Sequence, residues 1–269
     1  MAATKENPIV FYDLADANGT HWSFNTYKAR LSLNFKGIPY RVEYISFPEI
    51  ESRMAELGVH PISDTFPRYT LPVIADPSSG PDDTPTYVSD SFKIAIYLDE
   101  HYPSRPIFPT GTRATQNLLM NSHFLTITYT LLIPLVAPSL PTILDTRSVE
   151  YFAETRGMFL TPLPEEEQLA KWKATRDTFG GLAKAMQAGG GRWMGGDSPT
   201  FVDFIIGSFF YLVERLEGHE SERLRDMCTW DDGLWGRFWD GLRHIHSTTL
   251  TKPELRIHPH LPNFQSRNF

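Results

Sequence analysis

Apolar residues at the start of the chain follow the two periods of regular secondary structure. Residues 9–14 form a short run of strand-forming residues, and residues 40–46 alternate between apolar and polar positions. Between these runs, Tyr27, Leu31 and Phe35 recur at helical spacing and predict a helix. A strand, a helix and a second strand in this order favour a parallel pair joined by a right-handed crossover.

The following segment predicts a short helix, a hairpin and a capped helix. Residues 48–57 suit the helix, and the apolar runs 71–75 and 86–88 suit two strands. The connection between these strands is rich in Pro, Ser, Gly and Asp, so we expect a hairpin with an enlarged loop over residues 76–85. An Asp-Ser pair at residues 90–91 then precedes an amphipathic run, as a helix cap does.

Beyond residue 112 only helical periodicity remains. Helices are predicted over residues 113–133, 147–160, 164–187, 201–217 and 231–246. The predicted fold class is therefore an α/β domain over residues 1–104 followed by an all-α domain over residues 112–269. The segment 103–111 is the natural linker between them.

Composition and charge limit the partners of the protein. The chain has 269 residues, 41% of them hydrophobic, which argues against intrinsic disorder. Its formal net charge of −7 gives no general attraction to nucleic acid or anionic lipid. The single cysteine, Cys228, excludes an internal disulfide and fits a reducing compartment. The N-terminus lacks the apolar core of a signal peptide, and the apolar stretch 131–140 is too short to span a bilayer, so we expect a soluble, cytoplasmic protein.

Three short segments carry candidate ligand-binding groups. Pro72 opens a predicted strand; a cis Leu71–Pro72 bond would turn the backbone of Leu71 toward a peptide-like ligand, and otherwise Pro72 is a strand-entry residue. Asp90 and Ser91 at a helix N-terminus suit the ammonium and carboxylate of an α-amino-acid group, or form an ordinary cap. Ser23 lies between the first strand and the first helix, either as a ligand-binding group or only as an N-cap.

In combination these segments resemble the thioredoxin-like domain of the glutathione transferase superfamily. Residues 193–203 are similar to the segment that enters the central helix of that family's second domain, and within them Thr200 and Asp203 predict a capping box. A narrower resemblance is to the fungal etherase-like (fungal A) class, related to the bacterial lignin β-aryl etherases. It rests on residues 22–30 (WSFNTYKAR), 69–74 (YTLPVI) and 88–95 (VSDSFKIA). Phe24 departs from this class, since a proline is expected there.

The resemblance implies a transferase with glutathione as co-substrate and the glutathione thiolate as nucleophile. The implied thiolate donors are the Ser23 hydroxyl and the Asn25 backbone N–H, so replacement of the Asn25 side chain is expected to be tolerated. The implied glutathione-binding residues are Leu71, Pro72, Asp90 and Ser91. Arg53, Arg68 and Lys36 all stay open as partners of the glycyl carboxylate.

The resemblance also places a hydrophobic electrophile between the domains, above Ser23, for conjugation or aryl-ether cleavage in detoxification. The predicted substrate-pocket residues are Trp22, Phe24, Met120, Phe124 and Tyr129. Met120 and Phe124 lie at helical spacing and suit the plain core equally well. An aromatic lining favours aromatic substrates.

The main alternative is a non-catalytic ligandin that binds aromatic small molecules in the same pocket. Cysteine-based chemistry is disfavoured because Cys228 lies in the helical half, where it suits a buried apolar position, and no C-x-x-C occurs. The pairs His244/His246 and His258/His260 lack the i, i+4 spacing of helical zinc ligands, so we expect no metal and solvated side chains. A homodimer is left open.

Overall fold

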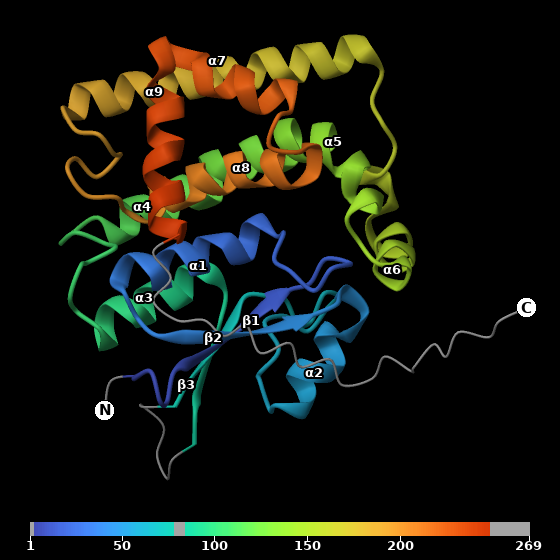
Figure 1. The fold of residues 1–269 in the computed structure, drawn as a ribbon, viewed down its shortest axis with the longest axis vertical. Helices are drawn as coiled ribbons and strands as arrows, with labels where there is room; N and C mark the ends of the chain where they lie inside the picture. Colours follow the sequence, from blue (N-terminus) through green and yellow to red (C-terminus); the bar gives the residue numbers. More distant parts are fainter. Residues whose placement is uncertain (1–2, 78–83, 248–269) are drawn as a thin grey trace, which may run out of the picture.

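A four-stranded sheet forms the N-terminal half of the protein in the computed structural model, which describes residues 3–77 and 84–247 (Figure 1). Its strands are β1 (Ile9–Leu14), β2 (Tyr40–Ile45), β3 (Val73–Asp76) and β4 (Thr86–Ser89). In the order β2-β1-β3-β4, β1 runs parallel to β2 and antiparallel to β3, and β4 is antiparallel to β3. The expected parallel pair and hairpin are confirmed, although β3 begins at Val73 rather than at Leu71.

Local signals set the ends of the helices in this domain. These helices are α1 (Phe24–Lys36), the 3₁₀ turn η1 (Phe47–Glu49), α2 (Ile50–Glu56) and α3 (Ser91–His101). Ser23 is the N-cap of α1, and the helix ends at Gly37, whose φ of 67° is left-handed. Asp90 caps α3, because its carboxylate accepts hydrogen bonds from the N–H groups of Phe92 and Lys93.

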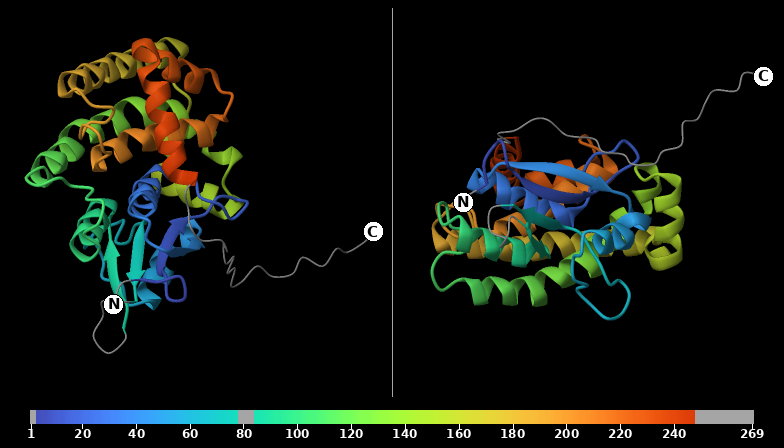
Figure 2. Two further views of the ribbon diagram at one scale, coloured as in Figure 1. Left: turned by 60° about the vertical axis from the view of Figure 1, so that its left-hand side comes forward. Right: turned by 90° about the horizontal axis from the view of Figure 1, so that it is seen from below.

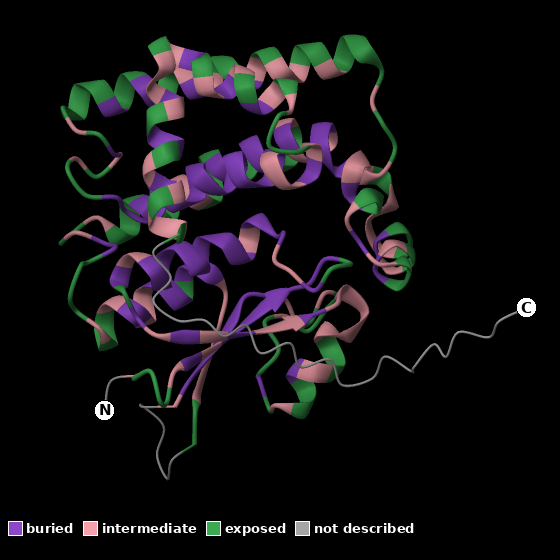
Figure 3. Cartoon of the chain, viewed as in Figure 1, coloured by how far each residue is buried: buried purple, intermediate pink, exposed green. Residues whose placement is uncertain are grey.

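Side chains pack on both faces of the sheet, and β1, β3 and α1 are largely buried (purple in Figure 3). Side chains alternate along a strand, so Ile9 and Phe11 of β1 face one way and Tyr12 and Leu14 the other. The first pair packs in one cluster with residues of α1 and α3. The second pair packs in the cluster that includes Met54 of α2 and continues into the helical domain. Helix α1 lies between the sheet and that domain, where it packs against α8 and α9 (Figures 1 and 2).

The C-terminal half is helical, as predicted. Its elements are α4 (Arg113–Leu119), η3 (Met120–Phe124), η4 (Ile127–Leu132), α5 (Ile133–Val136), η5 (Ala137–Thr142), α6 (Thr146–Arg156), η6 (Gly157–Phe159), α7 (Glu165–Gly189), α8 (Phe201–Glu217) and α9 (Glu222–Ser247). The helix predicted over residues 113–133 is a run of α-helical and π-helical turns, the latter being η3 and η4. By length and composition alone, Arg113–Thr142 could cross a membrane, but 44% of its most apolar window is buried inside the protein.

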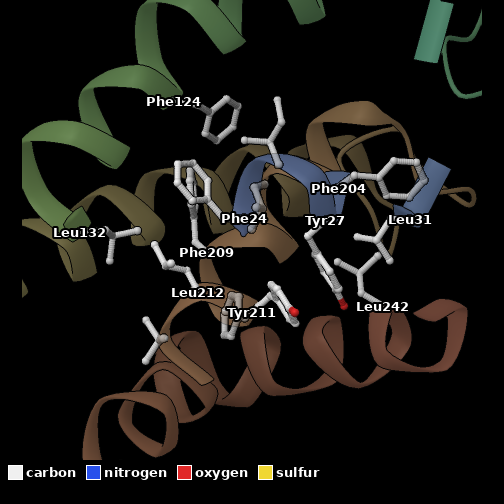
Figure 4. Packing of buried hydrophobic residues seen from close by; sticks show 14 of the residues in the cluster. Phe24, Tyr27, Leu31, Phe124, Leu132, Phe204, Phe209, Tyr211, Leu212 and Leu242 are labelled. Carbon is white, nitrogen blue, oxygen red and sulfur yellow. The ribbon is translucent and has the colours of Figure 1, made fainter. Parts of the chain in front are cut away.

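Helix α8 lies at the centre of this domain. Figure 4 shows its side chains Phe204, Phe209 and Leu212 among residues of α1, η3 and α9. Its predicted capping box is confirmed, since Thr200 donates its backbone N–H to the Asp203 carboxylate at 2.8 Å. Burial raises the pKa of Asp203 to about 6.

Helix α9 differs from the prediction because it begins at Glu222 and bends in the middle. The predicted helix over residues 231–246 corresponds to its second arm. At the bend, the left-handed region holds Asp231, Asp232 and Gly233, with φ of 51°, 56° and 71°.

The two domains meet along α1. Tyr27 of α1 stacks on Tyr211 of α8 with ring centres 3.8 Å apart, and Arg215 of α8 pairs with Asp16 at 2.7 Å. His246 at the end of α9 packs on Tyr27 with ring centres 5.2 Å apart. The expectation that His246 is solvated is wrong, because its ring is enclosed at this interface and burial lowers its pKa to about 4.

Some predictions concern residues that the structure does not describe. These are the middle of the hairpin loop at residues 78–83, the pair His258/His260 and the end of the second domain after residue 247. His244, of the other histidine pair, is exposed as expected.

Candidate functional site

A cavity of about 350 Å³ lies between the two domains. This volume is within the range of small-molecule sites, about 300–1,000 Å³. The N-terminal domain lines it with the start of α1, with α2 and with the segment before β3; the helical domain adds η4, α6 and the end of α8. Of the predicted site residues, the cavity brings together Trp22, Ser23, Phe24, Asn25, Leu71 and Tyr129.

Ser23 presents its hydroxyl to this cavity from the N-terminus of α1. Its Oγ accepts a hydrogen bond from the backbone N–H of Asn25 at 3.3 Å. The residue is only 6% exposed, and no acceptor in the described part of the chain takes its hydroxyl proton. The proton is therefore available to a ligand atom, next to the positive end of the helix dipole.

Lys28, which the sequence analysis missed, lies beneath this group on the next turn of α1. Its ammonium donates to Asn25 Oδ1 at 2.9 Å and lies 5.6 Å from the centre of the Phe24 ring. Burial lowers the pKa of Lys28 to about 8, while the Asp90 carboxylate opposes this effect. Its signal in the sequence was a lysine next to Tyr27, close to the start of the predicted helix.

Leu71 reaches the cavity next to a cis peptide bond to Pro72. The Pro72 carbonyl accepts a hydrogen bond from the Asp90 N–H at 3.2 Å, which joins this segment to the start of α3. Asp90 has a φ of 81° and Ser91 is buried; neither lines the cavity itself. The cap interpretation of Asp90 is thus confirmed, and its contact with a ligand stays a prediction.

The structure distinguishes the three cations that the sequence offered as partners of the glycyl carboxylate. Arg53 is held by two glutamates of its own domain at 2.7 and 2.8 Å, and Lys36 is buried against Asp99 at 2.7 Å. Arg68 lines the cavity, and within the described residues its ion pair is an exposed one with Glu51 at 3.4 Å, beside a cation–π contact of 5.7 Å with the Tyr69 ring. Exposed pairs are weak, so Arg68 is the cation of the three that a ligand can recruit.

The structure places the five predicted substrate-pocket residues in two different surroundings. Trp22, Phe24 and Tyr129 line the cavity, but Met120 and Phe124 do not. Phe124 is 2% exposed and Met120 packs beside it, because this face of the long helical run lies against α8 in the core. Their positions fit the core interpretation, with Phe124 buried and Met120 partly buried.

Most aromatic side chains of the cavity come from segments that the sequence analysis did not consider. They are Phe47, Phe66, Tyr151, Phe152 and Phe159. The signal that could have found them is the density of aromatic residues around positions 66–69 and 151–159. Periodicity placed these segments in a loop and a helix without showing which way either faces.

The single thiol lies within the helical domain, away from the cavity. Cys228 is half-buried on α9, and burial raises the pKa of its thiol, which suppresses its nucleophilic form. Within residues 3–77 and 84–247, no three His, Cys, Asp or Glu side chains gather where they could hold a metal ion.

Two family models match the chain. The one described as "Glutathione S-transferase, N-terminal domain" matches residues 22–101, and "Glutathione S-transferase, C-terminal domain" matches residues 114–244. Among curated proteins, the Glutathione S-transferase-like protein ustS of Aspergillus flavus is 32% identical over 254 residues, covering 89% of this chain and 91% of the relative.

Solved structures agree over nearly the whole length. A glutathione S-transferase of Ceriporiopsis subvermispora, solved in complex with glutathione, has a TM-score of 0.80 at 34% identity and covers 92% of this chain and 100% of its own. Glutathione transferase GSTFuA3 from Phanerochaete chrysosporium has a TM-score of 0.76 at 30% identity, covering 88% and 97%. With both domains matched and these fungal relatives covering 88–92% of its length, the chain belongs to the glutathione S-transferase family.

Proposed function

We propose that this protein is a glutathione transferase in which Ser23 stabilises the glutathione thiolate for attack on hydrophobic, aromatic electrophiles. The observation that carries the proposal is the Ser23 hydroxyl, whose proton is available at the N-terminus of α1 inside an aromatic cavity. The relative from Ceriporiopsis subvermispora was solved with glutathione, which supports glutathione as the co-substrate.

The reaction requires a sulfur anion near neutral pH. A hydrogen bond from Ser23 to the thiolate and the field of α1 both favour the anion over the thiol. A hydrogen bond to a charged group contributes about 1.5–3 kcal/mol, so Ser23 should lower the thiol pKa by about one to two units. The Asn25 N–H, now bonded to Ser23 Oγ, is a second donor that can turn to the sulfur.

The remaining contacts place the tripeptide along the edge of the N-terminal domain. Leu71 offers its backbone to the cysteinyl unit, and Asp90 with Ser91 binds the γ-glutamyl ammonium and carboxylate at the start of α3. Arg68 takes the glycyl carboxylate, since its pair with Glu51 is exposed and easily exchanged.

The electrophile enters from the helical domain, between Trp22 and Tyr129. The thiolate attacks an aromatic or benzylic carbon, a C–S bond forms, and a halide or an aryloxide leaves. The leaving group that the cavity accepts determines the reaction: loss of a halide gives conjugation, and loss of an aryloxide gives etherase-like cleavage.

The proposal is tested by titrating the bound glutathione thiolate through its ultraviolet absorbance. The wild type should show a depressed thiol pKa, and Ser23→Ala should raise that pKa by about one to two units and lower the rate at neutral pH about tenfold or more. Ser32→Ala is the matched control, because this buried hydroxyl of α1 bonds only to the Lys28 carbonyl at 2.9 Å and should leave the thiol pKa unchanged. Glutathione bound with an unshifted pKa would contradict the proposal and point to a non-catalytic ligandin.

A cytoplasmic homodimer belongs to the same proposal. The helical run from α4 to η4 exposes Leu118 and Leu125 on a face with no Lys, Arg, Asp or Glu between Arg113 and Asp145. A second copy would remove these side chains from water. Light scattering should then give twice the 30.7 kDa of one chain, and Leu118→Glu should return the mass to that of a monomer.

A further inference from the structure

Arg156 carries a positive charge into the aromatic half of the cavity. It is the last residue of α6, and its guanidinium carbon lies 5.8 Å from the ring centre of Phe47, 5.7 Å from Phe66 and 5.9 Å from Phe152. These rings come from η1, from the segment before β3 and from α6 itself. Three elements therefore converge on one guanidinium at the wall that faces the electrophile.

No carboxylate in the described part of the chain pairs with Arg156. Its Nη1 donates to the neighbouring Thr155 hydroxyl at 2.9 Å, which leaves several of its five N–H donors for another acceptor. The other charged residues on the cavity wall, Glu51 and Arg68, pair with each other. The wall thus has one uncompensated positive charge, although the whole chain carries a net charge of −7.

The surrounding rings suit this group for binding an anion. Cation–π contacts with ring faces use none of the N–H donors of a guanidinium, so the fork that matches a carboxylate stays available. The rings also hold the side chain in place, so that less rotamer freedom is lost when a ligand binds. The same rings offer apolar surface to an aromatic body attached to that anion.

We propose that Arg156 selects electrophiles that are aromatic carboxylates, with the carboxylate on Arg156 and the ring against Phe47 and Phe152. This inference rests on the proposed function, because it names the substrate class of the same cavity. It makes Arg156 a substrate-binding residue of the helical domain, whereas Ser23 acts on the sulfur.

The test uses a matched pair of probes, 4-chloro-3-nitrobenzoate and its methyl ester. In both, the glutathione thiolate attacks the chlorine-bearing carbon, the C–S bond forms and chloride leaves with the electron pair of the C–Cl bond. Each kcat/KM is divided by the rate constant of the uncatalysed reaction with glutathione, which removes the difference in intrinsic reactivity. The Kd values of the two glutathione conjugates are measured by calorimetry alongside.

The wild type should prefer the carboxylate in both measurements. Arg156→Gln should reduce that preference about 10- to 100-fold, through KM more than kcat, because the carboxylate loses a charged hydrogen bond that the ester does not make. Arg156→Lys keeps the charge without the fork and should retain part of the preference. Arg147→Gln removes an exposed charge from the other end of α6 and is the control, with no change expected.

The outcomes separate this inference from the proposed function. Turnover of both probes without a carboxylate preference, or an equal loss for both in Arg156→Gln, overturns the inference while the transferase function stands. If neither probe turns over and the conjugates still bind with a preference that Arg156→Gln abolishes, the anion site is supported and the catalytic proposal fails. Conjugates that bind without preference overturn the inference even when there is no turnover.

Discussion

The ammonium group of Lys28 has an amide oxygen as its partner where a buried cation usually has a carboxylate. It donates to Asn25 Oδ1 at 2.9 Å, and burial lowers its pKa to about 8. Asn25 therefore has two separate functions at the site. Its backbone N–H faces Ser23, and its side chain solvates Lys28.

This second function changes what is expected of Asn25→Ala. The sequence alone predicted that the substitution is tolerated, because a backbone group is the candidate thiolate donor. We now expect the thiol pKa of bound glutathione to stay unchanged and the free energy of unfolding to fall by about 1–3 kcal/mol, since a buried ammonium loses its acceptor. Urea denaturation at neutral pH measures the loss, and ultraviolet titration measures the thiol pKa.

The double variant with Lys28→Met identifies the cause. Without the ammonium there is nothing for the amide to solvate, so Asn25→Ala should cost much less in the Lys28→Met background. If the loss of unfolding free energy in the double variant equals the sum of the losses in the two single variants, Asn25 stabilises the fold by some other contact.

Among the elements, the spacing of apolar residues predicted nearly every helix and strand. The prediction failed where tertiary contacts determine the backbone conformation. The segment from Asp231 to Gly233 contains a single glycine and no proline, so its pattern predicts the start of a helix. In the fold, three consecutive residues there take left-handed conformations, and the Asp231 carboxylate accepts the indole N–H of Trp235 at 2.8 Å. The bend folds one arm of α9 back on the other. Asp-Asp-Gly tolerates left-handed backbone and so permits the bend, but the tertiary contacts of the two arms decide that it forms there.

Because the two arms of α9 are in close contact, Gly236→Ala should lower the stability of the protein. A Cβ at this position would lie 2.7 Å from the Cys228 carbonyl oxygen, so the arms would have to separate. We expect the free energy of unfolding to fall by about 1–3 kcal/mol, as for other overpacked sites. Gly181→Ala in α7 is the matched control: its Cβ meets nothing within 4 Å, and the helix should gain about 0.4–1 kcal/mol. Equal results for both variants in denaturant titrations would contradict a close contact between the arms.

In the whole molecule, prediction from the sequence succeeded for residues placed by local motifs and failed for residues whose positions depend on how helices and domains pack together. Ser23 and Leu71 were predictable because short local motifs place them at the start of α1 and beside β3. Phe124 and Arg156 were not, because each helix of the second domain has several plausible faces. Packing of the helical run against α8 turns Phe124 into the core, and the docking of the two domains turns Arg156 toward the cavity between them.

This docking encloses two neutral histidines. His246 of α9 packs on His21 of the N-terminal domain, with ring centres 5.2 Å apart. The hydroxyl of Tyr211 lies against the His21 ring nitrogen and donates to its carbonyl at 2.9 Å. Burial, together with the nearby Arg30, lowers the pKa of both histidines.

The domain interface should therefore loosen in acid. The pKa of His246 is about 4 in the fold against 6.5 for the free side chain, so the unfolded chain takes up a proton first as the pH falls. Stability is complete above pH 6.5 and declines toward pH 4, by about 2–3 kcal/mol for His246, with a further decline from His21. Urea denaturation at pH 7, 6, 5 and 4 measures the slope. His246→Phe keeps an aromatic ring on Tyr27 without the titration and should show a shallower decline; an unchanged slope would place the acid sensitivity elsewhere in the protein.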